Sequence, residues 1–174
     1  GGNLDLLKRI IASGIPVVIE KGYELHSEGW LGHYLTIFGY DDATQEMVSL
    51  DTNLGPWDSS GRYDSYEDIE KYWQQFNRTF FVVYPPEQEQ SVADILGGTL
   101  LEPATMWQSA AQAAQAEIDA TPDNAFAWFN LGTSLTRLGE LSGEIDFYQD
   151  GAAAFDQAFI LGVPQRNLWY QFRP

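Results

Sequence analysis

The sequence predicts an α+β domain, built on a largely antiparallel sheet with flanking helices, followed by an all-α segment. Helix-like and strand-like patterns alternate through residues 1–86, whereas almost no strand pattern follows them. The dipeptide Pro85–Pro86 separates the two parts, because proline ends both helices and strands. Composition changes at the same point, since the first part holds 6 basic and 13 acidic residues and the second holds 3 and 12. We therefore expect a first domain at 1–86, a linker at 87–103 and a helical domain at 104–174.

Two helices and four strands are predicted in the first domain. Leucine and isoleucine recur at helical spacing from Leu4 to Ser13, and the glycine that follows ends this helix because it tolerates positive φ. A second helix is predicted from Ser65, its N-cap, to Phe76. Runs of β-branched and aromatic residues predict strands at Ile15–Ile19, His33–Tyr40, Glu46–Asp51 and Arg78–Tyr84. A turn over residues 41–43 joins the middle two strands.

Three helices are predicted in the second domain, at Ala104–Ala120, Ala125–Leu138 and Tyr148–Leu161. A shorter helix is expected in the linker, near Val92–Leu96. The pattern Trp-x-x-Leu-Gly-x-x-Leu begins at Trp128, and a second tryptophan, Trp169, lies 41 residues further on. This pattern resembles the tetratricopeptide repeat, a helix pair of about 34 residues. The extra residues are expected at Leu141–Asp146, between the paired helices.

Charge and residue counts exclude several classes of partner and site. The formal net charge is −16, and such a surface repels the phosphates of nucleic acids and of anionic membranes. No apolar run approaches the roughly 20 residues of a membrane span. The chain contains no cysteine, which removes disulfides, thiolate metal sites and a cysteine nucleophile from these 174 residues. The lack of cysteine suits reducing and oxidising compartments alike and gives no localisation.

The two histidines, His26 and His33, are the candidates for acid–base chemistry near neutral pH. His33 opens a predicted strand, and a turn at 41–43 places it directly opposite Asp51 in the next strand. Residues that face one another in this way have Cβ atoms about 5 Å apart. Asp51 would then orient and stabilise the imidazole, as the acid of a nucleophile–His–acid triad does. A loop two residues longer puts Asn53 opposite the histidine instead, and an asparagine also orients the ring.

Three aromatic residues, Trp30, Trp57 and Tyr63, are candidates to line a peptide groove near the histidine. An equally simple interpretation is that they are loop aromatics that cap a small core. No metal site is expected, because the two histidines lack metal-ligand spacing. The calcium-like start Asp51–Gly55 continues with Pro56, where an EF-hand needs glycine. No cofactor is expected either.

Residues 4–86 resemble the peptidase C39-like domains, which are papain-like cysteine peptidases. The most specific part runs from Gly32 to Asp42, where the sequence GHYLTIFGYDD resembles the family strand that carries the catalytic histidine. Further family segments are matched by GIPV at residues 14–17, by the acidic stretch Leu50–Asn53, by the helix that holds Tyr66 and Trp73, and by the last strand at Phe80–Val83.

The resemblance implies a partial papain-like fold in which His33 is the general base and Asp51 orients it. The family's nucleophilic cysteine and oxyanion glutamine lie on an N-terminal helical lobe. We expect that lobe to be missing here, so that the chain is the His/Asp-bearing, C-terminal half of a peptidase domain fused to tetratricopeptide repeats. Such a fragment is inactive alone, because it has no nucleophile. The alternative is a non-catalytic papain-like and tetratricopeptide module that binds peptides or serves as a scaffold.

A missing lobe would leave apolar surface exposed on the sheet, around Val17, Leu35, Ile37 and Phe80. A truncated repeat would leave a second open surface at the C-terminal aromatic segment, which holds Leu168, Trp169, Tyr170 and Phe172. We therefore expect the chain to form homo-oligomers through one of these surfaces, because large exposed apolar patches are rare on monomers. Peptides or proteins are the other expected partners.

Overall fold

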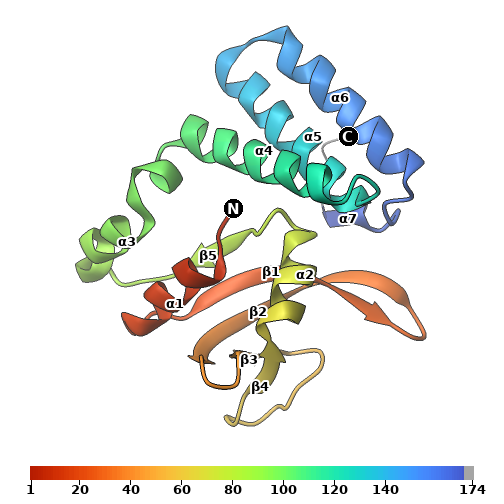
Figure 1. Ribbon diagram of the computed structural model, residues 1–174. Coiled ribbons are helices and arrows are strands. Elements are labelled where there is room, and N and C mark those ends of the chain that lie inside the picture. The colour runs from red at the N-terminus through yellow and green to blue at the C-terminus, as the bar shows by residue number, and fades with distance from the viewer. Residues whose placement is uncertain (171–174) are drawn as a thin grey trace. The chain divides into compact units, whose positions relative to one another are not determined.

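The computed structural model describes residues 1–170 and contains two compact units. Residues 2–23 and 32–97 form the first, here called the sheet unit. Residues 24–31 and the chain from Gly98 onward form most of the second, the helical unit. The predicted α+β class is confirmed, because a five-stranded antiparallel sheet is accompanied by several helices (Figure 1).

The sheet runs in the order β4-β3-β2-β1-β5, with its two shortest strands at the edges. Its strands are β1 (Val17–Leu25), β2 (Gly29–Asp41), β3 (Glu46–Leu50), β4 (Arg62–Ser65) and β5 (Phe80–Val82). Short edge strands offer few unpaired backbone groups to another chain. The long β1 and β2 lie inside the sheet, where both of their edges are paired.

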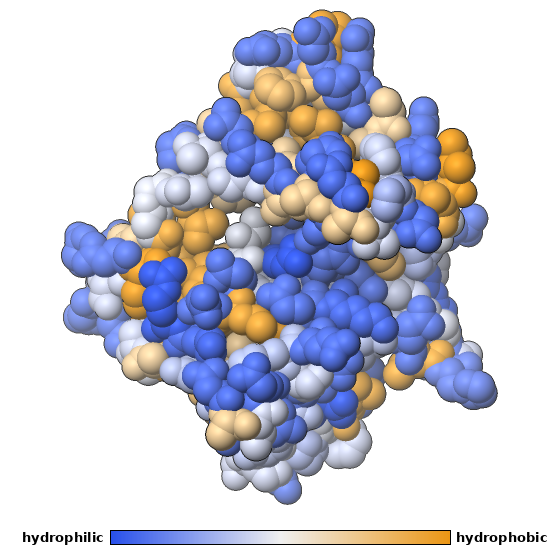
Figure 2. All heavy atoms as spheres, viewed as in Figure 1, coloured by the Kyte–Doolittle hydropathy of each residue, from blue (hydrophilic) through white to orange (hydrophobic). Residues whose placement is uncertain are grey.

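The two faces of the sheet differ in burial. On one face, Val17 and Ile19 of β1 and Ile37 of β2 are fully buried. On the other, Tyr34 and Phe38 of β2 remain 47% and 40% exposed. Successive side chains of a strand point to opposite faces, so this alternation separates a core face from an open face. Figure 2 shows one side of the molecule, on which apolar side chains gather in separate patches among hydrophilic ones.

Two helices belong to the sheet unit, α1 (Leu4–Ala12) and α2 (Tyr66–Gln74). Each begins with a side-chain cap, in which Asn3 or Ser65 accepts a hydrogen bond from a backbone amide three residues later. The predicted N-cap of the second helix is thereby confirmed. The apolar faces of both helices are fully buried, and they include Leu7, Ile10, Ile69 and Trp73.

Several strand predictions need correction. β2 begins at Gly29, four residues before the predicted start, so His33 lies within the strand and does not open it. β1 continues well beyond the predicted end at Ile19. The prediction stopped there because the charged residues Glu20 and Lys21 follow, but both are buried within the strand. β4 was not predicted, since its sequence Arg-Tyr-Asp-Ser lacks the apolar alternation typical of a strand. It forms by antiparallel pairing with β3. β5 is shorter than predicted and is confined to Phe80–Val82.

The pairing of β2 with β3 differs from the expected register. Thr36, and not Tyr34, lies opposite Leu50. Continued along the strand, this register would place the alternative partner Asn53 opposite His33. The expectation that His33 lies directly opposite Asp51 in the sheet is therefore wrong. A contact between the two side chains depends on the path of the chain after β3.

Two local features cause the change of register. The strands extend to Asp41 and Glu46, so the turn between them holds the four residues 42–45 and not the three predicted. A bulge also interrupts the ladder between Ile37 and Gly39. A bulge sets two residues of one strand against one of the other, which shifts all later pairs.

The predicted linker is largely helical. A 3-10 turn at Pro86–Gln88 leads into α3 (Glu89–Leu101), which is longer than the helix expected near Val92–Leu96. The backbone of α3 leaves helical geometry at Gly97, which has φ 69° and ψ 170°. Glycine adopts this positive φ without steric cost. The sheet unit ends at this break, and the helical unit continues from Gly98.

The helical unit contains α4 (Pro103–Ala120), α5 (Ala125–Ser142), α6 (Ile145–Ile160) and the short α7 (Asn167–Tyr170). α5 packs against both α4 and α6 (Figure 1). The ring centroids of Phe129 in α5 and Phe155 in α6 are 5.0 Å apart. A Cβ atom at Gly132 would come within 2.8 Å of the Phe155 ring, which explains the glycine of the repeat pattern. The tetratricopeptide assignment itself stays a prediction.

The expected loop at Leu141–Asp146 is wrong. α5 continues to Ser142 and α6 begins at Ile145, so the extra residues lengthen the helices and not their connection. Gly143 ends α5 with a left-handed φ of 76°, and its amide donates to the Gly139 carbonyl at 2.8 Å. Of the helices described, none is long and apolar enough to cross a membrane.

Candidate active site

Asp51 lies directly after β3, where the chain leaves the sheet and turns. Its side chain is fully buried. Its Oδ1 atom accepts hydrogen bonds from the backbone amides of Asn53 at 2.8 Å and Leu54 at 2.9 Å. Aspartate is favoured in such turns, because its short side chain reaches the amides just ahead of it. The turn therefore holds one carboxylate oxygen in a fixed position.

His33 reaches the same carboxylate from β2. Its Nε2 atom lies 3.1 Å from Asp51 Oδ1, which is within hydrogen-bond distance. The His33 side chain is 20% exposed and the Asp51 side chain 0%, so solvent reaches the imidazole but not the acid. The structure thus brings together the two residues that the sequence predicts as base and orienting acid. Their catalytic roles stay predictions.

Tyr23 is a third member of this cluster, and the interpretation of the sequence missed it. Its hydroxyl donates a hydrogen bond to Asp51 Oδ2, and its ring centroid is 5.6 Å from that of His33. Tyr23 lies in β1 beyond the predicted end of the strand. A signal was present, because Tyr23 is an even number of residues from Val17 and Ile19. A longer strand would have placed it on their buried face.

Opposing effects decide the charge of Asp51. Burial raises its pKa, but hydrogen bonds from the Tyr23 hydroxyl and from two backbone amides, together with His33, hold the pKa below the usual value for a carboxyl group. Asp51 is therefore ionised at neutral pH and only accepts hydrogen bonds. The hydrogen shared with His33 consequently lies on Nε2, and Nδ1 of the neutral imidazole carries the lone pair.

Tyr23 and Lys21 extend the cluster along β1. Burial and donation to Asp51 raise the pKa of Tyr23 far above its usual value, so the hydroxyl stays protonated as a donor. Lys21 is also buried, and its ammonium lies 4.9 Å from the centre of the Tyr23 ring and 5.9 Å from that of Tyr72. Burial lowers the pKa of Lys21 and outweighs the attraction of nearby carboxylates.

Asn53, the alternative orienting residue, contributes its backbone amide to Asp51. The other histidine, His26, is exposed and belongs to the helical unit. Among the described residues, no group of three or more His, Cys, Asp or Glu side chains is arranged to hold a metal ion. The contact of His33 with the Asp51 carboxylate suits transfer of a proton at the imidazole.

The three aromatic groove candidates have different environments. Trp57 is 79% exposed and donates its indole N–H to the Thr52 carbonyl at 3.1 Å. Tyr63 is also exposed, in β4. Trp30 is buried and belongs to the helical unit, where its ring centroid is 5.6 Å from that of Phe126. Their role in a peptide groove stays a prediction.

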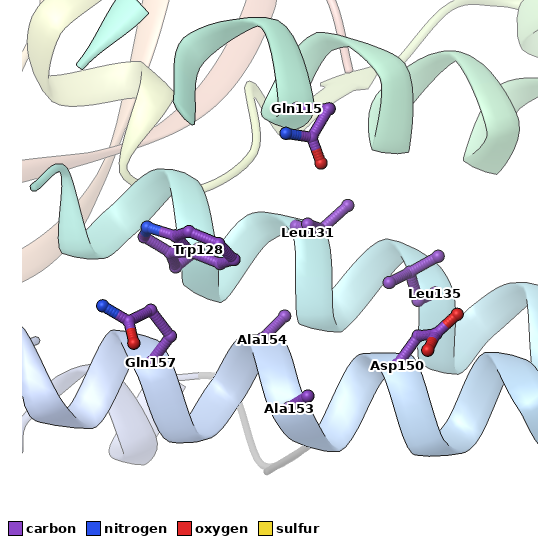
Figure 3. A pocket seen from close by; sticks show the side chains of 8 residues that line it. All are labelled: Gln115, Trp128, Leu131, Leu135, Asp150, Ala153, Ala154 and Gln157. Carbon is purple, nitrogen blue, oxygen red and sulfur yellow. The ribbon is translucent and has the colours of Figure 1, made fainter. Parts of the chain in front are cut away.

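A separate groove of about 470 Å³ lies among the helices of the helical unit (Figure 3). The volume is in the range of pockets that hold small ligands. Trp128 at one end is held by its indole N–H, which donates to the Pro122 carbonyl at 2.9 Å. The apolar floor is formed by Trp128, Leu131, Leu135 and Ala154, and polar groups are added by Gln157 and Asp150.

One comparison with known proteins gives a match. Residues 2–81, just under half of the chain, match the family model described as the Peptidase_C39 like family. The matched segment contains Tyr23, His33 and Asp51, and it indicates a peptidase-like domain in that part of the chain. No curated protein and no solved structure matches the chain.

Proposed function

We propose that His33 and Asp51 form the base-bearing part of a cysteine-peptidase active site. The observation that carries the proposal is the contact of His33 Nε2 with a buried, ionised Asp51 that is itself held by a turn. The match of residues 2–81 to a peptidase C39-like family supports it. Peptides or proteins are the proposed substrates.

The geometry suits a base that works through Nδ1. In the proposed reaction, Nδ1 of His33 accepts the proton of a cysteine thiol, and the thiolate attacks the carbonyl carbon of a peptide bond. Asp51 stabilises the imidazolium that forms, because its carboxylate stays bound to Nε2–H. The imidazolium then returns the proton to the leaving amine, and water hydrolyses the acyl-enzyme.

The 174 residues contain no cysteine, so the proposed nucleophile belongs to a polypeptide segment other than these residues. We infer that this chain alone does not cleave peptides by this route. The proposal also includes a role for the helices α4 to α6 as tetratricopeptide-like repeats that hold the protein substrate. The Trp-x-x-Leu-Gly pattern of α5 and the apolar groove beside it support this role.

A non-catalytic module that binds peptides or acts as a scaffold is the second candidate. The observation in its favour is the lack of cysteine, together with exposed aromatic side chains on the open face of the sheet. The two functions differ in one property that is simple to measure, which is the dependence of any thiol reactivity on His33.

The test uses the protein translated from the complete reading frame that encodes these residues. An electrophilic peptide probe for cysteine peptidases, followed by mass spectrometry, reports labelling of an activated thiol. We expect labelling that His33→Ala abolishes, that Asp51→Asn reduces about 10²–10⁴-fold, and that His26→Ala leaves unchanged. A reading frame without cysteine, or labelling that persists in His33→Ala, would contradict the peptidase proposal and favour the binding module.

A further inference from the structure

We propose that Tyr23 is a positioning residue for the candidate active site, whose hydroxyl holds Asp51 Oδ2 so that Oδ1 stays directed at His33. The catalytic consequence of this inference rests on the proposed function. The positioning itself does not, since it concerns three side chains of one folded unit.

The two oxygens of Asp51 have separate sets of donors. Oδ1 accepts from the amides of Asn53 and Leu54 and faces His33 Nε2. Oδ2 accepts from the Tyr23 hydroxyl. A carboxylate can turn about its Cβ–Cγ bond, and such a turn exchanges the two oxygens. Donors on both oxygens resist the turn, so the orientation of Asp51 depends on Tyr23 as well as on the backbone.

The backbone amides alone do not fix the orientation of the Asp51 carboxylate, because both bind Oδ1. If Oδ2 had no donor, a fully buried anionic oxygen would be left unsatisfied, which strongly favours protonation or rotation of the group. Either change weakens the acceptor that Nε2–H of His33 requires. Tyr23 prevents both changes, because its phenol stays protonated and donates to Oδ2.

The position of Tyr23 is fixed by β1. The side chain is 6% exposed, and its ring lies beside the His33 ring at a centroid distance of 5.6 Å and an interplanar angle of 53°. The ammonium of Lys21, also in β1, lies over the Tyr23 ring, 4.9 Å from its centroid. One residue therefore restrains the acid through its hydroxyl and the imidazole through its ring.

Other charged groups lie near the same cluster and also influence the pKa values of its members. Lys21 contributes from β1, Arg62 and Asp64 from β4, and Asp68 from α2. Arg62 Nε is bound to Asp64 Oδ1 at 2.9 Å. All four residues are kept in Tyr23→Phe, so the only hydrogen bond to Asp51 that this substitution removes is the one from the Tyr23 hydroxyl.

The first experiment uses the 174-residue chain and needs no substrate. The carboxyl ¹³C resonance of Asp51 is followed by NMR as a function of pH in the wild type, in Tyr23→Phe and in Tyr34→Phe. We expect the pKa of Asp51 to rise in Tyr23→Phe, because a hydrogen bond to the charged form is lost. Tyr34→Phe is the matched control, since that hydroxyl bonds to Glu20 and not to Asp51.

A measurement on the wild type alone keeps the inference testable if Tyr23→Phe does not fold. The ¹³Cζ resonance of Tyr23 reports the bonding of its hydroxyl, and it should titrate with the same midpoint as Asp51. Separate midpoints in the wild type, or an unchanged Asp51 titration in folded Tyr23→Phe, would overturn the inference.

The second experiment separates this inference from the proposed function. In the protein from the complete reading frame, Tyr23→Phe should lower kcat about tenfold with KM unchanged. Tyr66→Phe, which removes a hydroxyl bonded to Asp42 Oδ1 at 2.9 Å outside the candidate site, should change neither. A protein without His33-dependent activity would overturn the peptidase proposal, while the NMR titrations still decide the role of Tyr23. An active protein whose kcat is insensitive to Tyr23→Phe would overturn the catalytic consequence.

Discussion

At the scale of single residues, the buried carboxylate of Asp51 is held by several hydrogen bonds. It accepts from the Tyr23 hydroxyl and from the backbone amides of Asn53 and Leu54, and it contacts His33. Hydrogen bonds to a charged acceptor are about twice as strong as those between neutral groups. Loss of this acceptor leaves the buried Tyr23 hydroxyl and two partly buried amides without a partner, so Asp51 supports the fold as well as the candidate site.

The substitution Asp51→Ala should destabilise the protein by about 3 kcal/mol at pH 7, because buried donors lose their acceptor. Urea unfolding monitored by circular dichroism measures this change. The matched control is Asp58→Ala, since Asp58 caps the Ser60 amide at 2.9 Å in an exposed turn. The control should cost about 1 kcal/mol or less. Equal losses in the two variants would contradict the special role of Asp51.

The contribution of Asp51 to stability should also depend on pH. Its pKa is lower in the folded protein than in the unfolded chain, where it is about 3.9. The folded state therefore prefers the ionised form, and the stabilisation is complete above about pH 4 and is lost as the pH falls through the folded value. The difference in unfolding free energy between the wild type and Asp51→Ala should shrink in urea titrations at pH 3. A difference that stays constant from pH 7 to pH 3 would argue against an ionised Asp51.

At the scale of elements, the packing of α5 on α6 depends on a glycine without a side chain. Gly132→Ala would place a Cβ atom 2.8 Å from the Phe155 ring. Phe155 is buried and cannot move freely, so we expect a loss of about 1–3 kcal/mol. The control Gly98→Ala has open space around the new methyl group in α3 and should be neutral or stabilising by up to about 1 kcal/mol. Thermal unfolding of both variants tests the difference in sign.

The helices could be predicted from the sequence because their signals are local. Apolar spacing and a cap residue are enough to place a helix, and Ser65 is an example. The register of β2 on β3 could not be predicted in this way, because it depends on a bulge and on the length of the turn. The proximity of His33 and Asp51 was expected for a register that does not occur, and it arises because the turn after β3 directs the carboxylate to the imidazole.

Tyr23 and β4 were missed for a different physical reason. Buried Glu20 and Lys21 interrupt the apolar pattern of β1, so the strand that carries Tyr23 seemed to end early in the sequence. β4 contains Arg62 and Asp64, which are bound to each other, and its pairing with β3 is a tertiary interaction. Propensity is a weak guide where tertiary contacts decide the structure.

At the scale of the whole molecule, the exposed apolar surface predicted around Val17, Leu35, Ile37 and Phe80 is wrong, because the first three side chains are buried and Phe80 is partly buried. We propose instead that the chain self-associates through the opposite, open face of the sheet. Tyr34 and Phe81 are 47% and 50% exposed on this unit, and their ring centroids are 6.0 Å apart. Exposed aromatic clusters of this kind are typical of interaction surfaces. The net charge of −16 opposes association, but the repulsion is screened beyond about 8 Å at physiological salt.

Sedimentation velocity over a concentration series tests this proposal. Phe81→Gln should weaken association at least about tenfold, and Leu141→Gln, at a similarly exposed apolar position of the helical unit, should not. The second predicted surface is tested by Trp169→Gln, while its neighbour Phe172 lies outside the described residues. A sample that stays monomeric at every concentration would contradict self-association through either surface.

The helical unit is discontinuous along the chain, since it includes residues 24–31 as well as the chain from Gly98 onward. Trp30 from this early segment lies 5.6 Å from the Phe126 ring and 6.0 Å from the Tyr170 ring. Cleavage of the backbone at Gly97 would therefore release a C-terminal fragment that lacks Trp30, and gene fusions that begin at that point would lose these ring contacts. The chain from Gly98 onward is thus not the whole helical unit, even though Gly97 and Gly98 stand at the boundary between the two units.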